Sequence, residues 1–248
     1  MTPKPRLTIV IPAFNEEKTI AAVLTRLFEC VPTLFEVLIV DDASRDGTAE
    51  RCRAFAEHEP RVRVLSHRQN QGKTAALKTA FEQTRGDIIV IQDADMEYDP
   101  QEIPELIEPI VAGKADVCLG SRFLVRKAGR VLYFRHFLAN KFLTFFSNIL
   151  TDLNLTDIET GYKAARGVIF RSMVIESRGF GFEIEFVAKC RKIGARIYEV
   201  PISYYGRTYE EGKKIGVKDG IDALWYILKF NLLRSKAASF RSEPQLRR

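Results

Sequence analysis

Short apolar runs alternate with helical patterns over the first hundred residues. Four of these runs have the length and β-branched composition of strands: residues 7–11, 36–40, 62–66 and 87–91. This alternation predicts an α/β fold, in which a mostly parallel sheet is flanked by helices. Helix starts are predicted at Asn15, at Asp46, and at Asp99 followed by Pro100, because these residue types favour the first turn of a helix.

Polar residues follow three of the predicted strands where each strand ends. The segments are residues 12–16, Asp41 with Asp42, and Asp93 with Asp95. Because ligands bind beyond the carboxyl ends of parallel strands, we expect the three segments to meet at one cleft. Two carboxylates one residue apart can share a divalent cation, although acidic residues at strand ends also cap helices or form solvated turns.

Residues 131–150 carry a different, amphipathic pattern. At about 100° per residue, the apolar side chains fall on one broad arc with Arg135 near its middle, and polar residues such as Asn140 lie opposite. Charged residues interrupt the run, and a bilayer span needs about 20 apolar residues. The helix either packs on the core or lies in a membrane interface, where Arg135 would meet an anion.

A second amphipathic stretch begins at Ile221 and ends at Leu232. It is followed by a basic tail that contains Lys236 and Arg241. One interpretation is a helix that closes the core before a flexible, solvated terminus. The other is attraction of these charges to anionic headgroups. We predict that both amphipathic helices of the second half lie in an interface.

The composition indicates one domain in a reducing compartment. A chain of 248 residues with 46% hydrophobic content can bury one α/β core, and no linker rich in Pro, Gly or Ser divides it. Its four cysteines lie far apart without a CxxC pair, which argues against a zinc site or a disulfide framework. The N-terminus lacks the pattern of a secretory signal, so we expect a cytoplasmic protein.

The formal charge of +6 is divided unevenly along the chain. Residues 1–125 contain 15 Lys and Arg against 20 Asp and Glu, or −5, and residues 126–248 contain 23 against 12, or +11. A basic half fits nucleic acid, an anionic membrane surface, a phosphorylated substrate or a solvated face. No base-reading module accompanies the charges, so we do not expect a nucleic-acid partner.

Two common phosphate-binding motifs are absent from the sequence. The loop after the first predicted strand has no glycine, which excludes a GxGxxG dinucleotide loop. The segment from Gln71 to Thr74 imitates the end of a P-loop, but His67 stands where the first glycine belongs. Lys73 could still contact a phosphate as a point charge, or it could be solvated.

Six sequence blocks, in order, resemble the inverting glycosyltransferases of family 2, which have the Rossmann-like GT-A fold. The blocks are residues 11–16, 40–48, 70–73, 86–87, 93–95 and 120–123. Blocks in the second half resemble those of polyprenyl-phosphate sugar transferases of the dolichyl-phosphate mannosyltransferase type: residues 157–163, 181–183, 199–201 and 207–214. The resemblance covers residues 7–233, almost the whole chain.

The resemblance implies roles for individual residues. Around the donor nucleotide we expect Pro12, Phe14, Glu16, Asp41, Asp42, Lys73, Asp93 and Ala94. Asp93 and Asp95 would hold Mg²⁺ or Mn²⁺. Glu97 stands where close relatives commonly carry glutamine, and it either binds the metal or points to solvent.

On the acceptor side, the resemblance implies a lipid phosphate. Arg122 and Arg135 would lie near that phosphate, while Arg207 and Lys213 would lie on a loop that closes over the donor diphosphate. An acceptor phosphate is ionised near neutral pH, so its attack on the sugar requires no strong general base. Asp95 and the four basic residues are therefore the expected catalytic groups.

These observations predict metal-dependent, inverting transfer of a hexose from a GDP-mannose or UDP-glucose type of donor to a polyprenyl phosphate. The protein would be peripheral on the cytoplasmic face of an anionic membrane. We expect a single domain at 1–234, with a nucleotide and metal half at 1–125 and an acceptor half at 126–234, and a flexible basic tail at 235–248. One alternative is transfer to a saccharide hydroxyl with Glu183 or Asp157 as the base; another is a non-catalytic binder of nucleotide sugar.

Overall fold

Strands from both halves of the sequence join one sheet. The computed structural model describes residues 5–124, 130, 133–208, 210 and 217–246, and over these the sheet has seven strands. They are β1 (Leu7–Ala13), β2 (Leu34–Asp41), β3 (Val62–Ser66), β4 (Ile88–Ile91), β5 (Val117–Ser121), β6 (Lys163–Arg166) and β7 (Ile197–Pro201). The spatial order is β3-β2-β1-β4-β6-β5-β7, and among these strands β6 alone runs antiparallel to its neighbours. The predicted α/β fold with a mostly parallel sheet is confirmed.

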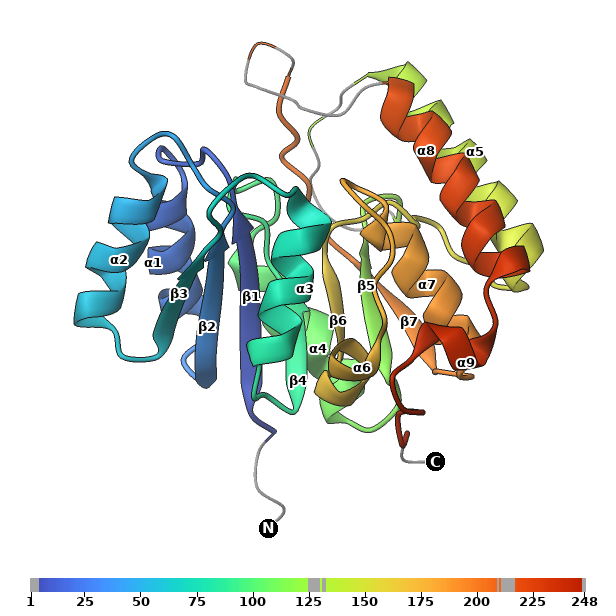
Figure 1. The fold of residues 1–248 in the computed structure, drawn as a ribbon, viewed down its shortest axis with the longest axis horizontal. Helices are drawn as coiled ribbons and strands as arrows, with labels where there is room; N and C mark the ends of the chain where they lie inside the picture. The colour runs from blue at the N-terminus through green and yellow to red at the C-terminus, as the bar shows by residue number, and fades with distance from the viewer. Residues whose placement is uncertain (1–4, 125–129, 131–132, 209, 211–216, 247–248) are drawn as a thin grey trace.

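Helices cover both faces of this sheet (Figure 1). In the described part of the chain they are α1 (Ile20–Cys30), α2 (Thr48–His58), α3 (Lys73–Gln83), η1 (Pro100–Glu102), α4 (Ile103–Val111), α5 (Phe134–Thr151), α6 (Gly167–Ser172), α7 (Phe182–Lys192), α8 (Val217–Leu228), the π-helical turn η2 (Lys229–Leu233) and α9 (Lys236–Ser239). Alternate residues of β4 serve two separate cores: Val90 packs with α1 and α4, and Ile89 packs with α3, α6 and α7.

Helix α1 begins later than the sequence predicts. The predicted start was Asn15, whereas the helix begins at Ile20. Asn15 adopts a positive φ of 54°, and its side-chain oxygen accepts a hydrogen bond from the backbone N–H of Arg45 at 2.8 Å. The backbone N–H of Glu16 donates to Thr48 Oγ1 at 2.8 Å. These two hydrogen bonds tie residues 15–16 to the loop after β2 and to the first residue of α2, so the chain follows a loop path here and the helix starts only at Ile20.

Helices α5 and α8 lie side by side at one end of the molecule (Figure 1). The side of α5 that faces the protein is partly polar: its buried residues are Leu143, Thr144, Ser147 and Thr151, and Phe146 and Leu150 pack against the core beside them. Large apolar side chains on the two helices and the turn after α8 are exposed: Phe134, Phe137, Leu138, Phe142, Phe145, Ile149, Ile221, Trp225, Leu232 and Leu233. No helix in the described residues is long and apolar enough to span a membrane.

The segment after residue 234 packs against the body of the protein, which differs from the flexible tail that the sequence predicts. Phe240 is buried and forms an isolated β-bridge with Met173. Arg241 donates from its backbone N–H to the carbonyl of Ser172 at 2.7 Å, and Leu246 packs against the core. Phe240 and Leu246 thus pack this segment against the protein, together with an ion pair between Arg241 and Glu82.

Candidate active site

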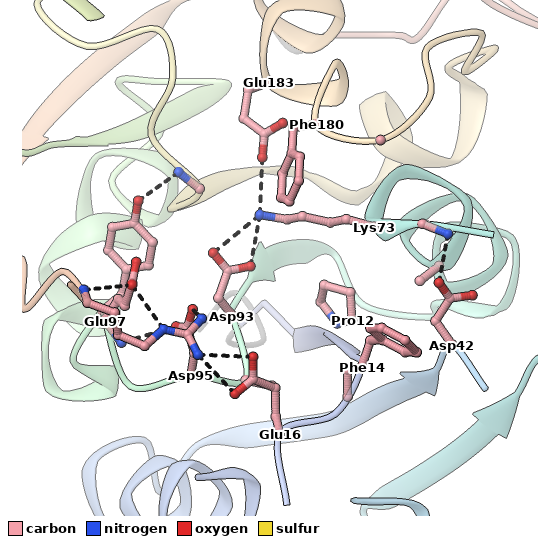
Figure 2. Close-up of a pocket in the computed structure, with 18 of the residues that line it drawn as sticks. Pro12, Phe14, Glu16, Asp42, Lys73, Asp93, Asp95, Glu97, Phe180 and Glu183 are labelled. Carbon is pink, nitrogen blue, oxygen red and sulfur yellow. Dashed lines mark hydrogen bonds and ion pairs between the residues drawn. The ribbon is translucent and has the colours of Figure 1, made fainter. Parts of the chain in front are cut away.

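A cavity of about 350 Å³ opens at the carboxyl ends of β1, β2 and β4. Adjacent parallel strands bring the segments after these strands to one edge of the sheet, as expected. Most residues assigned from the sequence line this cavity: Pro12, Phe14, Glu16, Asp42, Lys73, Asp93, Ala94, Asp95, Glu97, Arg122 and Arg207. Figure 2 shows the labelled side chains among them, such as Glu16, Lys73 and Asp93, around a common space.

Arg207 lies among three carboxylates, those of Glu16, Asp95 and Glu97. Figure 2 labels these three carboxylates on one side of the cavity. Arg207 Nη2 is 2.6 Å from Asp95 Oδ2, its Nη1 is 3.3 Å from Glu16 Oε1, and its Nε is 3.2 Å from Glu97 Oε1. Tyr204 also donates its hydroxyl to Glu97, at 2.8 Å. Burial opposes the charge of Arg207, but the three carboxylates outweigh it and raise the pKa of the guanidinium. Glu97 therefore points into the cluster.

A second cation separates Asp93 from a carboxylate on α7. Lys73 Nζ is 2.9 Å from Asp93 Oδ1 and 3.1 Å from Glu183 Oε1. Burial would lower the pKa of Lys73, but the charges of Asp93 and Glu183 outweigh burial and raise it well above its usual value. Lys73, the first residue of α3, thus lines the cavity as a charged side chain.

The Asp93 and Asp95 carboxylates suit a divalent cation. Burial, together with the charges of Asp93 and Glu97, raises the pKa of Asp95 even though Arg207 is adjacent. The site thus holds more negative charge than its side chains neutralise, and carboxylate oxygens are the donors that Mg²⁺ and Mn²⁺ prefer. Among the described residues, no three His, Cys, Asp or Glu side chains lie close enough together to hold a metal ion. Lys73 and Arg207 lie between the carboxylates and form ion pairs with Asp93 and Asp95.

Asp42 and Asp41, which are neighbours in sequence, have different surroundings. The Asp42 carboxylate accepts hydrogen bonds from the backbone N–H groups of Gln71 (2.9 Å) and Gly72 (2.7 Å), and His67 Nδ1 lies 2.6 Å away. Asp42 thereby holds the loop before α3 against the cavity. Asp41 is buried away from the cavity and accepts from the N–H of Ser44 at 3.3 Å, so the structure does not bring it to the donor site.

Arg122 stands between this cavity and a second one. Its guanidinium makes two hydrogen bonds to Asp157, at 2.7 and 2.8 Å, and stacks 5.1 Å from the centre of the Tyr204 ring. The second cavity, of about 360 Å³, lies between α5, α8 and the residues before α7. Arg122 and Glu159 line both cavities.

The structure does not bring two further basic residues, which were assigned to the acceptor or the diphosphate, to either cavity: one lies away from both, and the other is not described. Arg135 is exposed near the start of α5 and lines neither cavity. Lys213 lies outside the described residues.

Several cavity residues received no donor-site role from the sequence. Glu159 lies just before β6, and burial and the charge of Glu183 raise its pKa to about 7. Phe180 lies just before α7 and Glu183 in its first turn, and both line the cavity. In Figure 2 they are drawn above Lys73. The available signals were the blocks 157–163 and 181–183, which indicated a family but not a location.

Comparison with known proteins identifies relatives of this chain. The model of the family described as "Glycosyl transferase family 2" matches residues 8–175. The undecaprenyl-phosphate mannosyltransferase of Micrococcus luteus is 34% identical over 85% of this chain and 88% of its own length. The dolichol-phosphate mannosyltransferase of Pyrococcus furiosus is 27% identical over 85% of this chain and 60% of its own.

Solved structures confirm the GT-A fold. Glucosyl-3-phosphoglycerate synthase of Mycobacterium tuberculosis superposes with a TM-score of 0.71 at 21% identity, over 92% of this chain and 81% of its own. A structure of the same enzyme, described as a complex with Mn²⁺, UDP and phosphoglyceric acid, has a TM-score of 0.68 at 22% identity, over 92% and 79% of the two chains. At this level of identity the similarity concerns the fold.

Proposed function

This chain belongs to glycosyl transferase family 2, and on that basis we propose that it transfers a hexose from a nucleoside diphosphate sugar to a polyprenyl phosphate. The observation that carries the proposal is the junction of two cavities at Arg122. The first cavity is lined by carboxylates such as Asp93 and Asp95. The second is lined by residues of α5 and α8, the helices with exposed apolar faces. Relatives that bear the names of polyprenyl-phosphate mannosyltransferases support it.

The donor half would bind the diphosphate through charge. Asp93 and Asp95 would hold Mg²⁺ or Mn²⁺, which when bound takes up negative charge on the departing diphosphate. Arg207 supplies a second positive charge from its position among the carboxylates, and Lys213 is proposed to assist it. Pro12 and Phe14 offer an apolar surface to the nucleoside, beside the loop that Asp42 holds in place.

The acceptor half would orient a phosphate. Arg122, fixed by its paired hydrogen bonds to Asp157, lies at the junction where the acceptor oxygen would meet the anomeric carbon. In one displacement, that oxygen bonds to the carbon while the bond to the diphosphate breaks and its electron pair leaves with the diphosphate. Asp157 is fully buried in its pair with Arg122, so it is poorly placed to act as a base for a hydroxyl acceptor.

The exposed faces of α5 and α8 would bring the enzyme to its lipid. Solvated helices normally turn apolar residues inward, whereas here six large apolar side chains of α5 face outward. Transfer of such a face from water to a bilayer interface lowers the free energy of the protein. Arg135 at the start of α5 and Arg234 after η2 would then meet anionic headgroups.

Product formation tests this proposal. The protein would be incubated with Mn²⁺, a short-chain polyprenyl phosphate, and in turn GDP-mannose or UDP-glucose, and lipid-linked sugar would be separated by chromatography. We expect a lipid-linked hexose from one donor, and loss of the product when the phosphate is replaced by the free polyprenol. Glycosylation of a saccharide without any lipid-linked product would overturn the proposal and favour the hydroxyl acceptor.

A further inference from the structure

One buried amide holds both ends of the loop after β4, which carries three of the carboxylates that line the donor cavity. The loop spans residues 93–98, and its carboxylates are those of Asp93, Asp95 and Glu97. Gln92 is fully buried, and its Nε2 donates to the carbonyl of Asp93 at 3.2 Å and to the carbonyl of Tyr98 at 3.1 Å. The two hydrogens of this amide thus close the loop.

A tyrosine hydroxyl fixes the orientation of that amide. Tyr162 is fully buried, and its hydroxyl lies 2.9 Å from Gln92 Oε1, to which it donates, and 3.1 Å from the carbonyl oxygen of Asp99. Removal of the hydroxyl would take this donor from a buried oxygen, which is unfavourable. The amide could then rotate and exchange its nitrogen and oxygen, so that the two loop carbonyls would lose their donor.

The antiparallel direction of β6 places Tyr162 beside this loop. Strands β4 and β6 pair with Ile91 opposite Lys163, so the residue before β6 lies next to the residue after β4. The N–H of Gly161 donates to the hydroxyl of Tyr98 at 3.0 Å, and the rings of Tyr98 and Tyr162 stack with their centres 5.1 Å apart. The start of β6 therefore supports the acidic loop directly.

The supporting network is polar, although it stands in an apolar core that includes Val90 and Ile103. A phenylalanine ring would fill the same space as Tyr162 without a hydroxyl that needs a partner. A satisfied buried polar network instead specifies one arrangement of the chain. Here that arrangement is strained, since Met96 adopts a φ of 61° and neighbouring carboxylates repel one another. Such a conformation persists only where its surroundings hold it.

We propose that Tyr162 is a positioning residue for the divalent cation: through Gln92 it fixes the loop from which Asp93 and Asp95 approach the ion. This inference rests on the proposed function and specifies its cation requirement. Mg²⁺ demands near-ideal geometry with oxygens at about 2.1 Å, whereas Ca²⁺ accepts variable geometry at about 2.3–2.6 Å. A loop that is held in place favours the smaller ion, and a loop that can relax accepts either. Tyr162 therefore sets the ion preference of the site without contacting the ion.

Ion binding, measured without a sugar or an acceptor, tests this role. Mn²⁺ bound in the presence of GDP or UDP would be followed by electron paramagnetic resonance, and competition would give the affinities for Mg²⁺ and Ca²⁺. In Tyr162→Phe, we expect Mg²⁺ to bind about tenfold more weakly and Ca²⁺ affinity to change by about twofold or less. The ratio of the two affinities should therefore fall about fivefold or more. Partial unfolding does not change this ratio, because it removes binding of both ions equally.

Gln92→Met tests the same contact from its other partner. Methionine has about the length of glutamine but no amide, and the Tyr162 hydroxyl keeps the carbonyl of Asp99 as an acceptor, so this variant serves if Tyr162→Phe does not fold. We expect the same fall in the ratio. Adding Tyr162→Phe to Gln92→Met should lower it by a further twofold or less, because the hydroxyl has no amide left to orient. Fully additive losses would show that Tyr162 does not act through Gln92.

Tyr198→Phe is the matched control, because it removes the same hydroxyl from an exposed position on β7. It should preserve the ratio of Mg²⁺ to Ca²⁺ affinity. The same preserved ratio in Tyr162→Phe would overturn the proposal.

The outcome also separates this inference from the proposed function. A ratio that depends on Tyr162, found in a protein that forms no lipid-linked sugar, would support the positioning role and refute the acceptor. Lipid-linked sugar with an unchanged ratio in Tyr162→Phe would do the reverse. Failure of every divalent cation to bind with either nucleotide would overturn both the positioning role and the metal dependence of the proposed reaction.

Discussion

At the scale of single residues, Asp95 is the group on which the proposed cation site depends most. It is half-buried beside Asp93 and Glu97, and its ion-pair partner is Arg207 at 2.6 Å. We expect Asp95→Asn to lower sugar transfer about 100-fold or more, because the amide neither carries charge for a cation nor neutralises Arg207. Mn²⁺ binding, followed by electron paramagnetic resonance, should weaken in parallel. Unaltered Mn²⁺ affinity would remove Asp95 from the cation site.

Gly161 gives a second test of the same geometry. The methyl group of Gly161→Ala would collide with Asp93 Oδ2, because it would lie only 2.5 Å from that oxygen. We expect the variant to bind Mn²⁺ with nucleoside diphosphate about tenfold more weakly, since Asp93 must move away from the cavity. Gly220→Ala on α8 is the matched control, because nothing lies within 4 Å of a Cβ added there. Wild-type affinity in Gly161→Ala would show that Asp93 is not fixed there.

Glu159 makes stability depend on pH in a defined direction. Its pKa is raised from 4.5 to about 7, so the folded state binds a proton more tightly than the unfolded state. This contribution is fully present below about pH 4.5 and is lost as the pH rises through about 7. We expect Glu159→Gln to match the wild type near pH 4.5 and to be roughly 1–2 kcal/mol more stable near pH 8. Urea denaturation at both pH values measures it; a constant difference would contradict it.

At the scale of elements, α5 allows membrane contact and core packing to be tested on adjacent residues. Phe142 is 55% exposed, whereas Leu143 is 7% exposed. We expect Phe142→Ser to weaken vesicle binding about tenfold with little change in stability, because the ring contacts solvent rather than the core. Leu143→Ala should lower the free energy of unfolding by about 2 kcal/mol or more and leave vesicle binding of the folded protein intact. Vesicle sedimentation and urea denaturation separate the two, and identical behaviour would refute the assignment.

The elements that could be predicted from the sequence are those with a strong local pattern. Strands β1 to β4 are apolar runs, and their predicted limits agree with the structure to within a few residues. Strand β6 reads Lys-Ala-Ala-Arg, which has no β-branched residue, and it is a strand because β4 and β5 pair with it on both sides. The apolar arc of α5 could be predicted from the sequence. Whether that arc faces the core or the solvent depends on tertiary packing.

The site was predictable to a similar degree. Carboxylates at strand ends converge because parallel topology dictates it, so Glu16, Asp93 and Asp95 could be placed together. The ion pair between Lys73 and Glu183 joins residues that are far apart in sequence. No spacing rule links them, and only the packing of α7 beside α3 brings them into contact. Asp41 shows why sequence adjacency is not enough: Asp42 lines the cavity and Asp41 does not, because neighbouring strand-end residues point to opposite faces.

At the scale of the whole molecule, the uneven charge distribution predicts a salt-dependent membrane interaction. The second half carries +11, which includes the exposed Arg234 beside apolar Leu232 and Leu233 after α8. We expect binding to anionic vesicles to weaken when NaCl rises from about 50 to about 500 mM, because screening shortens the range of each charge. Binding to neutral vesicles should be weaker at low salt and almost insensitive to NaCl. Equal salt sensitivity for both vesicles would contradict an electrostatic contribution.

The exposed apolar face of α5 has a consequence for how long the enzyme survives. In water, its outward phenylalanines contribute little to holding the chain folded, since they remain largely exposed. A bilayer that binds this face binds the native state and not the unfolded one, so it shifts the unfolding equilibrium by mass action. The same helix would then set both the location and the lifetime of the protein, which would persist longest where the proposed lipid acceptor is found.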